Sequence, residues 1–509
     1  MVKTYLLGID AGTTGAKSVI FDVNGQLISK GYKEYPIIVP KTGWAEQDPN
    51  VWWNATIESL RTAINKASIV ADKIACIGLS GQTNSPSFVG KDGKPLRPCI
   101  VWMDRRAEPQ AAGIREKIGE EIIHKITGVK VDSFYSYCKI LWVKENQPEI
   151  YEKTEVILQP KDYIGFKLTD EYFLDKALAS SSGLLNTKQG HYATELLEEM
   201  GLSIKKLPRL VHSTEVIGNI TEKAAQITGL SKDTPVIAGS GDVMVNAVGS
   251  GVTKFGRAYN KTATASDLVT CADHPIFDSK FRMVSYLHAL PNKWLLVGGT
   301  GGGVCYRWFR DNFAQLEMEI AKSLNKDPYE IMDTEAQQVS PGSENLIFLP
   351  YLMGARSPIW DTKARGVYFG ISLNHDRRHF MRAIMEGIAF SVRHRMEIIE
   401  KELGVHIGEV RVVGGGARSA LWRRIMTDIY GKPVVLLGGE EQECLGAAIL
   451  AGVGIELYKD VVKVSDELIP VIEKSEPRKE NSEKYERLFK IYVGLHDKLK
   501  DSFSMLVES

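Results

Sequence analysis

Short apolar runs alternate with glycine-rich turns at the start of the chain. The apolar run at residues 5–9 has the length of a strand and ends at the acidic residue Asp10. The sequence GTTG at residues 12–15 predicts a turn, and residues 18–23 predict a second strand that completes a hairpin. Small residues in such a turn let backbone N–H groups approach an anion, and a carboxylate beside them can hold hydrated Mg²⁺. An ordinary hairpin turn would account for the same residues.

Strands that end in polar residues recur over the next hundred positions. Residues 53–64 carry apolar side chains at intervals of three and four, which predicts an amphipathic helix. Residues 74–80 and 99–106 predict further strands. Strands that alternate with helices indicate an α/β fold, in which ligands bind at the carboxyl ends of the strands. The polar and aromatic residues at these strand ends are Gln82, Thr83, Asn84, Trp102, Asp104 and Arg106.

An acidic residue also stands at a strand-to-helix turn near the middle of the chain. Residues 235–251 read PVIAGSGDVMVNAVGSG, which predicts a strand, a glycine turn that contains Asp242, and a helix of small residues. An acid at such a turn can lie close to a ligand. The alternative is that Asp242 only caps the helix, since aspartate is a preferred N-cap residue.

The last third of the chain contains a triple-glycine turn and an amphipathic helix. Residues 410–429 predict a strand, the glycines at 414–416, and a helix. Glycines at such a turn allow a nucleotide to approach the backbone, although tight packing of the chain needs the same residues. Apolar residues between 485 and 499 predict a terminal helix that docks on the rest of the protein.

Composition excludes several classes of protein. Among 509 residues, Lys plus Arg and Asp plus Glu both number 63, so no net charge favours nucleic acid or an anionic membrane as a partner. The six cysteines form no CxxC pair or Cys/His cluster, which argues against a metal site or disulfide framework and for a reducing compartment. No apolar run reaches membrane-spanning length. We therefore expect a soluble, cytoplasmic protein.

In this order the segments resemble the FGGY carbohydrate kinases, which belong to the actin/Hsp70-like ATPase superfamily. The resemblance covers residues 5–452. Its most specific stretches are residues 8–15 (GIDAGTTG), 43–53, 135–148 and 366–386.

The resemblance implies an α/β fold with two actin-like (ribonuclease H-like) domains that flank a central cleft. Residues 1–255 would form an N-terminal sugar-binding domain and residues 256–455 a nucleotide-binding domain. Residues 456–509 would form a linker and docking helix. The implied activity is ATP-dependent phosphorylation of a small sugar or polyol, with ATP and Mg²⁺ as cofactors. Relatives of this kind often form homodimers.

The resemblance also implies roles for single residues. Asp242 matches the catalytic base, and Asp10 matches the residue that positions Mg²⁺ during catalysis. The residues that match sugar contacts are Gln82, Thr83, Asn84, Trp102 and Asp104. Those that match nucleotide contacts are Thr13, Thr14, Thr264, Gly303, Gly415, Gly416 and Ala420. Trp422 is expected in the core rather than in a site.

Two departures from the family pattern bear on substrate and nucleotide. Thr83 and Asn84 stand where xylulokinase-like members usually have Met-His, and that pair contacts the sugar. In the second phosphate loop, at residues 261–266, Ala263 replaces a glycine while Thr264 is kept. A ketopentose such as D-xylulose is the leading substrate. The alternatives are gluconate, glycerol, a tetritol or a deoxy sugar, and a sugar-binding protein with little turnover.

Overall fold

Two compact units share the chain unevenly. The computed structural model describes residues 4–69, 71–439 and 441–508. The first unit comprises Met1–Lys254, Ala272–Leu295 and Gly439–Pro470, and the second comprises Phe255–Cys271, Leu296–Gly438 and Val471–Ser509. Two segments therefore return to the first unit after the chain has entered the second. The predicted domains at 1–255, 256–455 and 456–509 divide the sequence without such returns.

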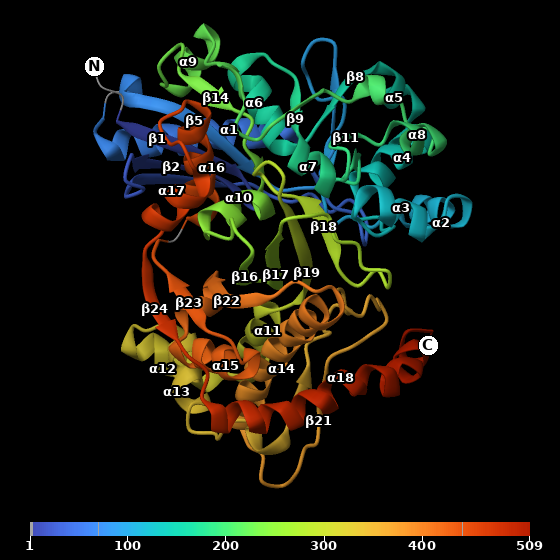
Figure 1. The fold of residues 1–509 in the computed structure, drawn as a ribbon, viewed down its shortest axis with the longest axis vertical. Coiled ribbons are helices and arrows are strands. Elements are labelled where there is room, and N and C mark those ends of the chain that lie inside the picture. Colours follow the sequence, from blue (N-terminus) through green and yellow to red (C-terminus); the bar gives the residue numbers. More distant parts are fainter. Residues whose placement is uncertain (1–3, 70, 440, 509) are drawn as a thin grey trace. The chain divides into compact units, whose positions relative to one another are not determined.

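The first unit is built on a mixed sheet with the strand order β13-β14-β5-β1-β2-β3 (Figure 1). Its first two strands form the predicted hairpin, because β1 pairs antiparallel with β2. On its other side β1 pairs parallel with β5, and the short strand β15 also pairs parallel with β5. The bounds are β1 Tyr5–Ala11, β2 Gly15–Asp22, β3 Leu27–Glu34, β5 Ile74–Gly81, β13 Val216–Asn219, β14 Pro235–Ile237 and β15 Ser240–Gly241.

Helices pack closely against this sheet. Helix α1 (Pro49–Ala67), which Asp48 caps, packs on β2 and β3. Helix α16 (Gln442–Gly454) packs on β1, β5 and helix α10 (Asp242–Gly249). A Cβ atom added to Gly8 of β1 would lie 2.2 Å from the carbonyl oxygen of Cys444, and one added to Gly78 of β5 would lie 2.0 Å from that of Ala447. Glycine is therefore required at both positions for α16 to reach the sheet.

The second unit repeats the same strand order. Six strands run β19-β17-β16-β22-β23-β24. Strands β16 and β17 form an antiparallel hairpin, β16 pairs parallel with β22, β22 pairs parallel with β23, and β23 pairs antiparallel with β24. This confirms the predicted α/β fold with two domains, each of which is built on a sheet. The bounds are β16 Gly256–Thr262, β17 Ala265–Ala272, β19 Trp294–Gly301, β22 Ile407–Val413, β23 Val434–Leu437 and β24 Val471–Ser475.

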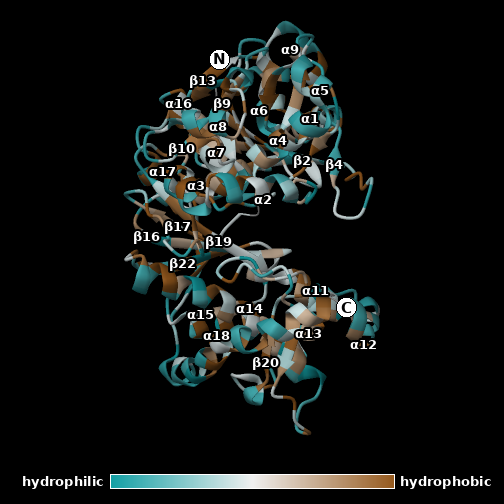
Figure 2. Cartoon of the chain, turned by 90° about the vertical axis from the view of Figure 1, so that its right-hand side faces the viewer, coloured by the Kyte–Doolittle hydropathy of each residue, from teal (hydrophilic) through white to brown (hydrophobic). Residues whose placement is uncertain are grey.

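Helices α11 (Gly303–Phe313), α12 (Gln315–Leu324), α13 (Pro328–Ala336), α14 (Arg377–Glu397) and α15 (Ala420–Tyr430) belong to this unit. The terminal helix α18 (Lys479–Glu508) packs on α14 and α15 through the buried residues Tyr485, Leu488, Tyr492 and Leu495, which confirms the predicted docking helix. Hydrophobic residues concentrate on strands such as β17 and β19, and polar ones cover helix α9 (Glu222–Thr228) of the first unit (Figure 2). Among the residues described, no helix combines the length and apolar character needed to cross a membrane.

Candidate active site

In the first unit, two carboxylates lie at the carboxyl ends of strands that flank β5. Asp10 of β1 is in register with Ser80 of β5, and Ser80 is in register with Ser240 of β15. Because adjacent strands are ~4.8 Å apart, the backbones at Asp10 and Ser240 are separated by about 10 Å. Asp242 follows Ser240 by two residues and begins helix α10. Both acids therefore stand at one edge of the sheet, where ligands bind in α/β folds.

Asp10 is buried and held in place by its neighbours. It is 6% exposed, and its Oδ1 atom accepts a hydrogen bond of 2.7 Å from the Ser80 hydroxyl. Lys17 lies opposite Asp10 on β2 and forms an ion pair of 3.0 Å with Glu441. Burial lowers the pKa of Lys17, but attraction to Asp10 and Glu441 outweighs burial and raises that pKa. Lys17 therefore stays cationic beside Asp10.

The surroundings of Asp10 fit a magnesium ion that a nucleotide brings with it. Among the described residues, no three His, Cys, Asp or Glu side chains cluster as metal ligands. Mg²⁺ needs no such cluster, because it is commonly held by one or two carboxylates together with water and substrate phosphates. Asp10, next to the small residues of the turn at 12–15, provides a carboxylate of this kind.

Asp242 is partly exposed and does not occupy the N-cap position. That position belongs to Gly241, and Asp242 is the first residue of α10. Its Oδ1 atom accepts a hydrogen bond of 2.8 Å from the backbone N–H of Val243. A Cβ atom added to Gly241 would lie 2.6 Å from Cγ2 of Thr83, so Thr83 lies against the backbone that precedes Asp242.

The predicted sugar contacts gather around the turn of the first hairpin. Trp102 donates a hydrogen bond of 2.9 Å from its indole N–H to the Thr13 hydroxyl. Gln82 donates 2.8 Å and 3.3 Å hydrogen bonds to the Gln47 side chain and the Gly12 carbonyl oxygen. The predicted sugar wall and the predicted phosphate turn are therefore joined by direct contacts. Thr14 is exposed at the tip of the turn.

Asn84 and Asp104 are already engaged by other parts of the protein. The Asn84 amide donates to the carbonyl oxygen of Ser181 at 3.1 Å, and its oxygen accepts from the backbone of Ser136 at 3.1 Å. Asp104 is 1% exposed and forms an ion pair of 2.7 Å with Arg106. Its Oδ2 atom also accepts from the backbone of Ala45. Both residues shape the site, and their contact with a sugar stays a prediction.

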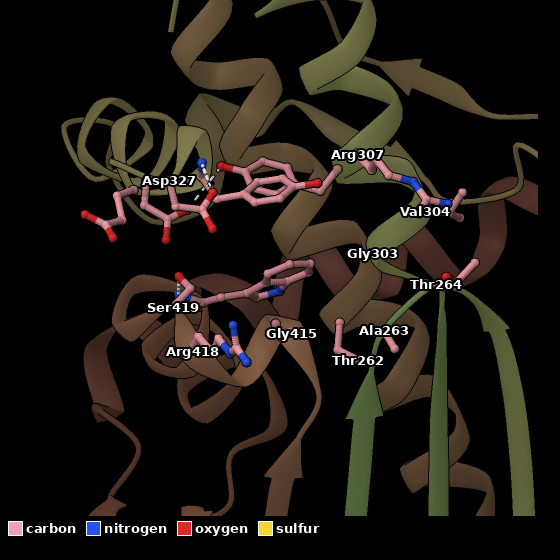
Figure 3. Close-up of a pocket in the computed structure, with 16 residues that line it drawn as sticks. Thr262, Ala263, Thr264, Gly303, Val304, Arg307, Asp327, Gly415, Arg418 and Ser419 are labelled. Atoms are coloured by element: carbon pink, nitrogen blue, oxygen red, sulfur yellow. Dashed lines mark hydrogen bonds between the residues drawn. The ribbon is translucent and has the colours of Figure 1, made fainter. Parts of the chain in front are cut away.

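The second unit contains a pocket of about 470 Å³. Four of the predicted nucleotide contacts line it, namely Thr264, Gly303, Gly415 and Gly416. Ala420 is not among the lining residues; it follows the lining residue Ser419 at the start of α15. Figure 3 shows Asp327 and Ser419 toward one end of the pocket and Thr264, Val304 and Arg307 toward the other. A Cβ atom on Gly303 would lie 2.4 Å from the carbonyl oxygen of Ala263, so the helix begins in contact with the hairpin turn.

Aromatic rings form much of the pocket and were not predicted from sequence. Tyr306 stacks on Tyr329 with ring centroids 5.5 Å apart, and its ring also meets that of Trp422 edge-on at 5.5 Å. The Tyr306 hydroxyl donates to Asp333 at 3.2 Å. Burial raises the pKa of Asp333. Trp422 is buried, as predicted for a core residue, yet it lines the pocket. Tyr306 and Trp422 each lie early in a helix that follows a glycine turn.

The replacement of glycine by Ala263 in the second phosphate loop is accommodated. Ala263 lies at the exposed turn between β16 and β17, and its N–H donates to the carbonyl oxygen of Ala265 at 2.8 Å. Its φ is not in the positive range, so the methyl group adds no backbone strain.

Comparison with known proteins agrees with this arrangement. The FGGY family of carbohydrate kinases matches the chain twice, with its N-terminal domain over residues 5–249 and its C-terminal domain over residues 268–455. The chain belongs to the FGGY family. It is a carbohydrate kinase, and members of this family use ATP.

Relatives with two different substrates in their names are almost equally similar. The chain is 32% identical over 509 residues to a gluconokinase of Bacillus subtilis, covering 100% of this chain and 98% of that protein. It is 31% identical over 498 residues to a xylulose kinase of the same organism, covering 98% and 97%. A crystal structure of ligand-bound xylulose kinase from Lactobacillus acidophilus superposes with a TM-score of 0.91 at 28% identity, covering 99% of each chain.

Proposed function

We propose that this FGGY kinase transfers the terminal phosphate of ATP to a hydroxyl group of a neutral small sugar, and that the best candidate is a ketopentose such as D-xylulose. The observation that carries the proposal is the register of strands β1, β5 and β15, which brings Asp10 and Asp242 to one edge of the first sheet. One partly exposed carboxylate and one buried carboxylate at a strand-end edge suit proton removal and charge neutralisation, the two tasks of phosphoryl transfer.

In this proposal Asp242 is the general base. Its partly exposed carboxylate accepts the proton of the sugar hydroxyl that attacks the phosphate. Asp10 holds Mg²⁺, which when bound neutralises charge on the phosphate oxygens. Thr13 and Thr14 present their hydroxyl and backbone groups to the phosphates. Gln82, Thr83 and Trp102 contact the sugar, and Asn84 and Asp104 hold those contacts in shape.

The pocket of the second unit is the proposed adenosine site. The faces of Tyr306, Tyr329 and Trp422 offer stacking surface for a base, while Gly415 and Gly416 let the ribose approach the backbone. Arg307 and Thr264, toward the opposite end from Asp327 in Figure 3, suit the phosphates.

Charge pairing favours a neutral sugar over an aldonate. Arg106 is paired with Asp104 and Glu46, and Arg105 is paired with Asp132 at 2.6 Å. Burial lowers the pKa of Lys139 to about 7, so this lysine is only partly charged at neutral pH. Because these two arginines are paired and this lysine is only partly charged, a sugar carboxylate beside them would lose water with little compensation, and such a loss is costly.

A substrate panel tests the proposal. ADP release should be measured with D-xylulose, D-gluconate, glycerol, a tetritol and a deoxy sugar, each at saturating ATP. We expect kcat/KM for the ketopentose to exceed that for gluconate by about 100-fold, which corresponds to ~2.7 kcal/mol. A preference for gluconate would refute the neutral substrate and leave the kinase reaction in place. Absence of turnover, with one sugar raising Tm, would instead favour the sugar-binding alternative.

A further inference from the structure

Three charged side chains are buried beneath the strand ends of the first unit. Lys161 and Asp162 begin helix α6 (Pro160–Thr169), and Asp175 ends strand β9 (Phe173–Asp175). The side chains of all three have no exposed area. Lys161 forms ion pairs with Asp162 and, at 3.0 Å, with Asp175. Removing ionisable groups from water is costly, as the rise of the Asp162 pKa to about 7 on burial indicates, and a buried ion pair is weak support for stability on its own. This cluster therefore needs another explanation.

Asp175 connects the cluster to the strand that leads to Asp242. One of its oxygens, Oδ1, accepts a hydrogen bond of 2.7 Å from the Ser240 hydroxyl and one of 3.1 Å from the Ser213 hydroxyl. The same atom accepts from the backbone N–H of Leu178, because Asp175 caps helix α7 (Lys176–Ser181). Hydrogen bonds to an ionised acceptor are short and about twice as strong as neutral ones.

Ser240 is well placed to fix the backbone before Asp242. Residues 239–241 read Gly-Ser-Gly, so the Ser240 hydroxyl is the only side-chain anchor in this stretch. Gly239 has a φ of +61°, and a Cβ atom there would lie 1.8 Å from the carbonyl oxygen of Leu79. Glycine is required at this position for the strand to approach β5, but glycine also lets the backbone adopt many conformations.

We propose that Asp175, held by Lys161, is a positioning residue that acts through the Ser240 hydroxyl to fix the strand end carrying Asp242. Lys161 fits directly below this edge, since a Cβ atom on Gly81 would lie 3.2 Å from the Lys161 Cβ. The inference rests on the proposed role of Asp242 as the base. It adds a buried, charge-assisted hydrogen bond that keeps the Asp242 carboxylate within reach of the proton on the sugar hydroxyl.

Two serines provide a matched pair of variants. Ser240→Ala and Ser213→Ala each remove one buried hydroxyl from the same carboxylate oxygen, but only Ser240 lies on the strand that leads to Asp242. We expect Ser240→Ala to lower kcat about tenfold while KM for the sugar stays within twofold. Ser213→Ala should leave kcat within twofold, with a similar change in Tm. Unchanged kcat in Ser240→Ala, or equal losses in both variants, would overturn the proposal.

Asp175→Asn tests the route through Ser240 and keeps the helix cap. Alone it should lower kcat by at least as much as Ser240→Ala, and the double variant should be no slower than Asp175→Asn alone. Losses that multiply in the double variant would show that Asp175 acts by another route and would overturn the proposal. Asp242→Asn, measured in parallel, tests the base role of Asp242 separately from the positioning role of Asp175. Near-normal turnover in Asp242→Asn would refute the base role whatever the serine variants do.

Discussion

The first hairpins of the two sheets have the same strand pairing, but their acidic and basic residues lie on opposite strands. Strands β1 and β16 each contain seven residues and each pairs with an antiparallel neighbour and a parallel one. The residue before the last is Asp10 in β1, opposite Lys17, and Lys261 in β16, opposite Asp267. The acid and the base have exchanged strands. The same topology thus places an acid at the end of β1 and a base at the end of β16.

The two acids of these pairs also differ in what surrounds them. Asp10 lies just before the glycine-rich turn, accepts a hydrogen bond from Ser80 and lies beside the charge of Lys17. Asp267 lies against the backbone of β19, since a Cβ atom on Gly299 would be 1.8 Å from its Oδ1 atom. Burial raises the pKa of Asp267, an effect that Arg356 and Arg395 oppose. Asp267 therefore packs against β19 while keeping some exposed surface, whereas Asp10 is more fully buried beside the glycine-rich turn.

The largest effect is expected at Asp242, the acid of the first unit that is proposed to remove a proton. Asp242→Asn should lower kcat about a thousandfold, because a general base contributes roughly 10² to 10⁴ in rate. Binding of the sugar, followed as a ligand-induced rise in Tm, should persist. A kcat within tenfold of the parent would remove Asp242 from the base role.

Asp10→Asn removes the negative charge at the end of β1 and so tests the difference between the two hairpins. We expect kcat/KM for ATP to fall about 100-fold, with partial recovery at high Mg²⁺ concentration, because the amide binds Mg²⁺ more weakly than the carboxylate. Lys261→Met, at the same position of the second hairpin, is the control and should leave the Mg²⁺ dependence unchanged. Equal Mg²⁺ dependence in the parent and Asp10→Asn would contradict the assignment.

A buried histidine makes the first unit sensitive to acid. Burial lowers the pKa of His288 to about 4, and its two ring nitrogens contact the Val252 carbonyl oxygen at 2.9 Å and the Leu290 N–H at 3.1 Å. The unfolded chain binds this proton more readily, so the stability present above pH ~6.5 is lost as pH falls toward the folded pKa. Between pH 6.5 and 5 the loss should reach about 2 kcal/mol.

Replacing this histidine separates its contribution from that of other acid-sensitive groups. His288→Gln keeps a polar side chain that does not titrate, so its Tm should fall less than that of the parent between pH 7 and 5. Parallel Tm curves for the two proteins would show that His288 titrates normally.

The smallest effect is expected in the aromatic pocket of the second unit. Tyr329→Ala should raise KM for ATP about fivefold, which corresponds to ~1 kcal/mol of lost ring contact. KM for the sugar should not change, because Tyr329 belongs to the second unit. Tyr329→Phe keeps the ring and should match the parent. A change in sugar KM with ATP KM unaffected would argue against an adenosine site here.

Local patterns were enough to predict the first hairpin and the acid at its strand end. The apolar run before Asp10 and the turn at 12–15 are contiguous in sequence, so their hairpin could be inferred from periodicity. Thr264, Gly303 and Gly415 were predicted as nucleotide contacts through the family resemblance, and the structure brings them together in one pocket.

Features that depend on distant contacts were not predicted. Trp422 is an apolar residue on a helix, and nothing local distinguishes a core tryptophan from one that lines a pocket with Tyr306. The link from Asp175 to Ser240 spans 65 residues. Asp104 forms an ion pair with Arg106, and only the folded chain shows that this pair is buried, while the sugar contact of Asp104 stays a prediction.

The seating of α16 on Gly8 and Gly78 has a consequence for how the protein is made. Strand β1 is synthesised long before helix α16, which covers it and ends at Gly454. One face of the nascent first sheet therefore lacks this native cover until α16 has been synthesised. The enzyme closes its first unit late, and a product truncated before residue 442 would leave that face exposed to chaperones and proteases.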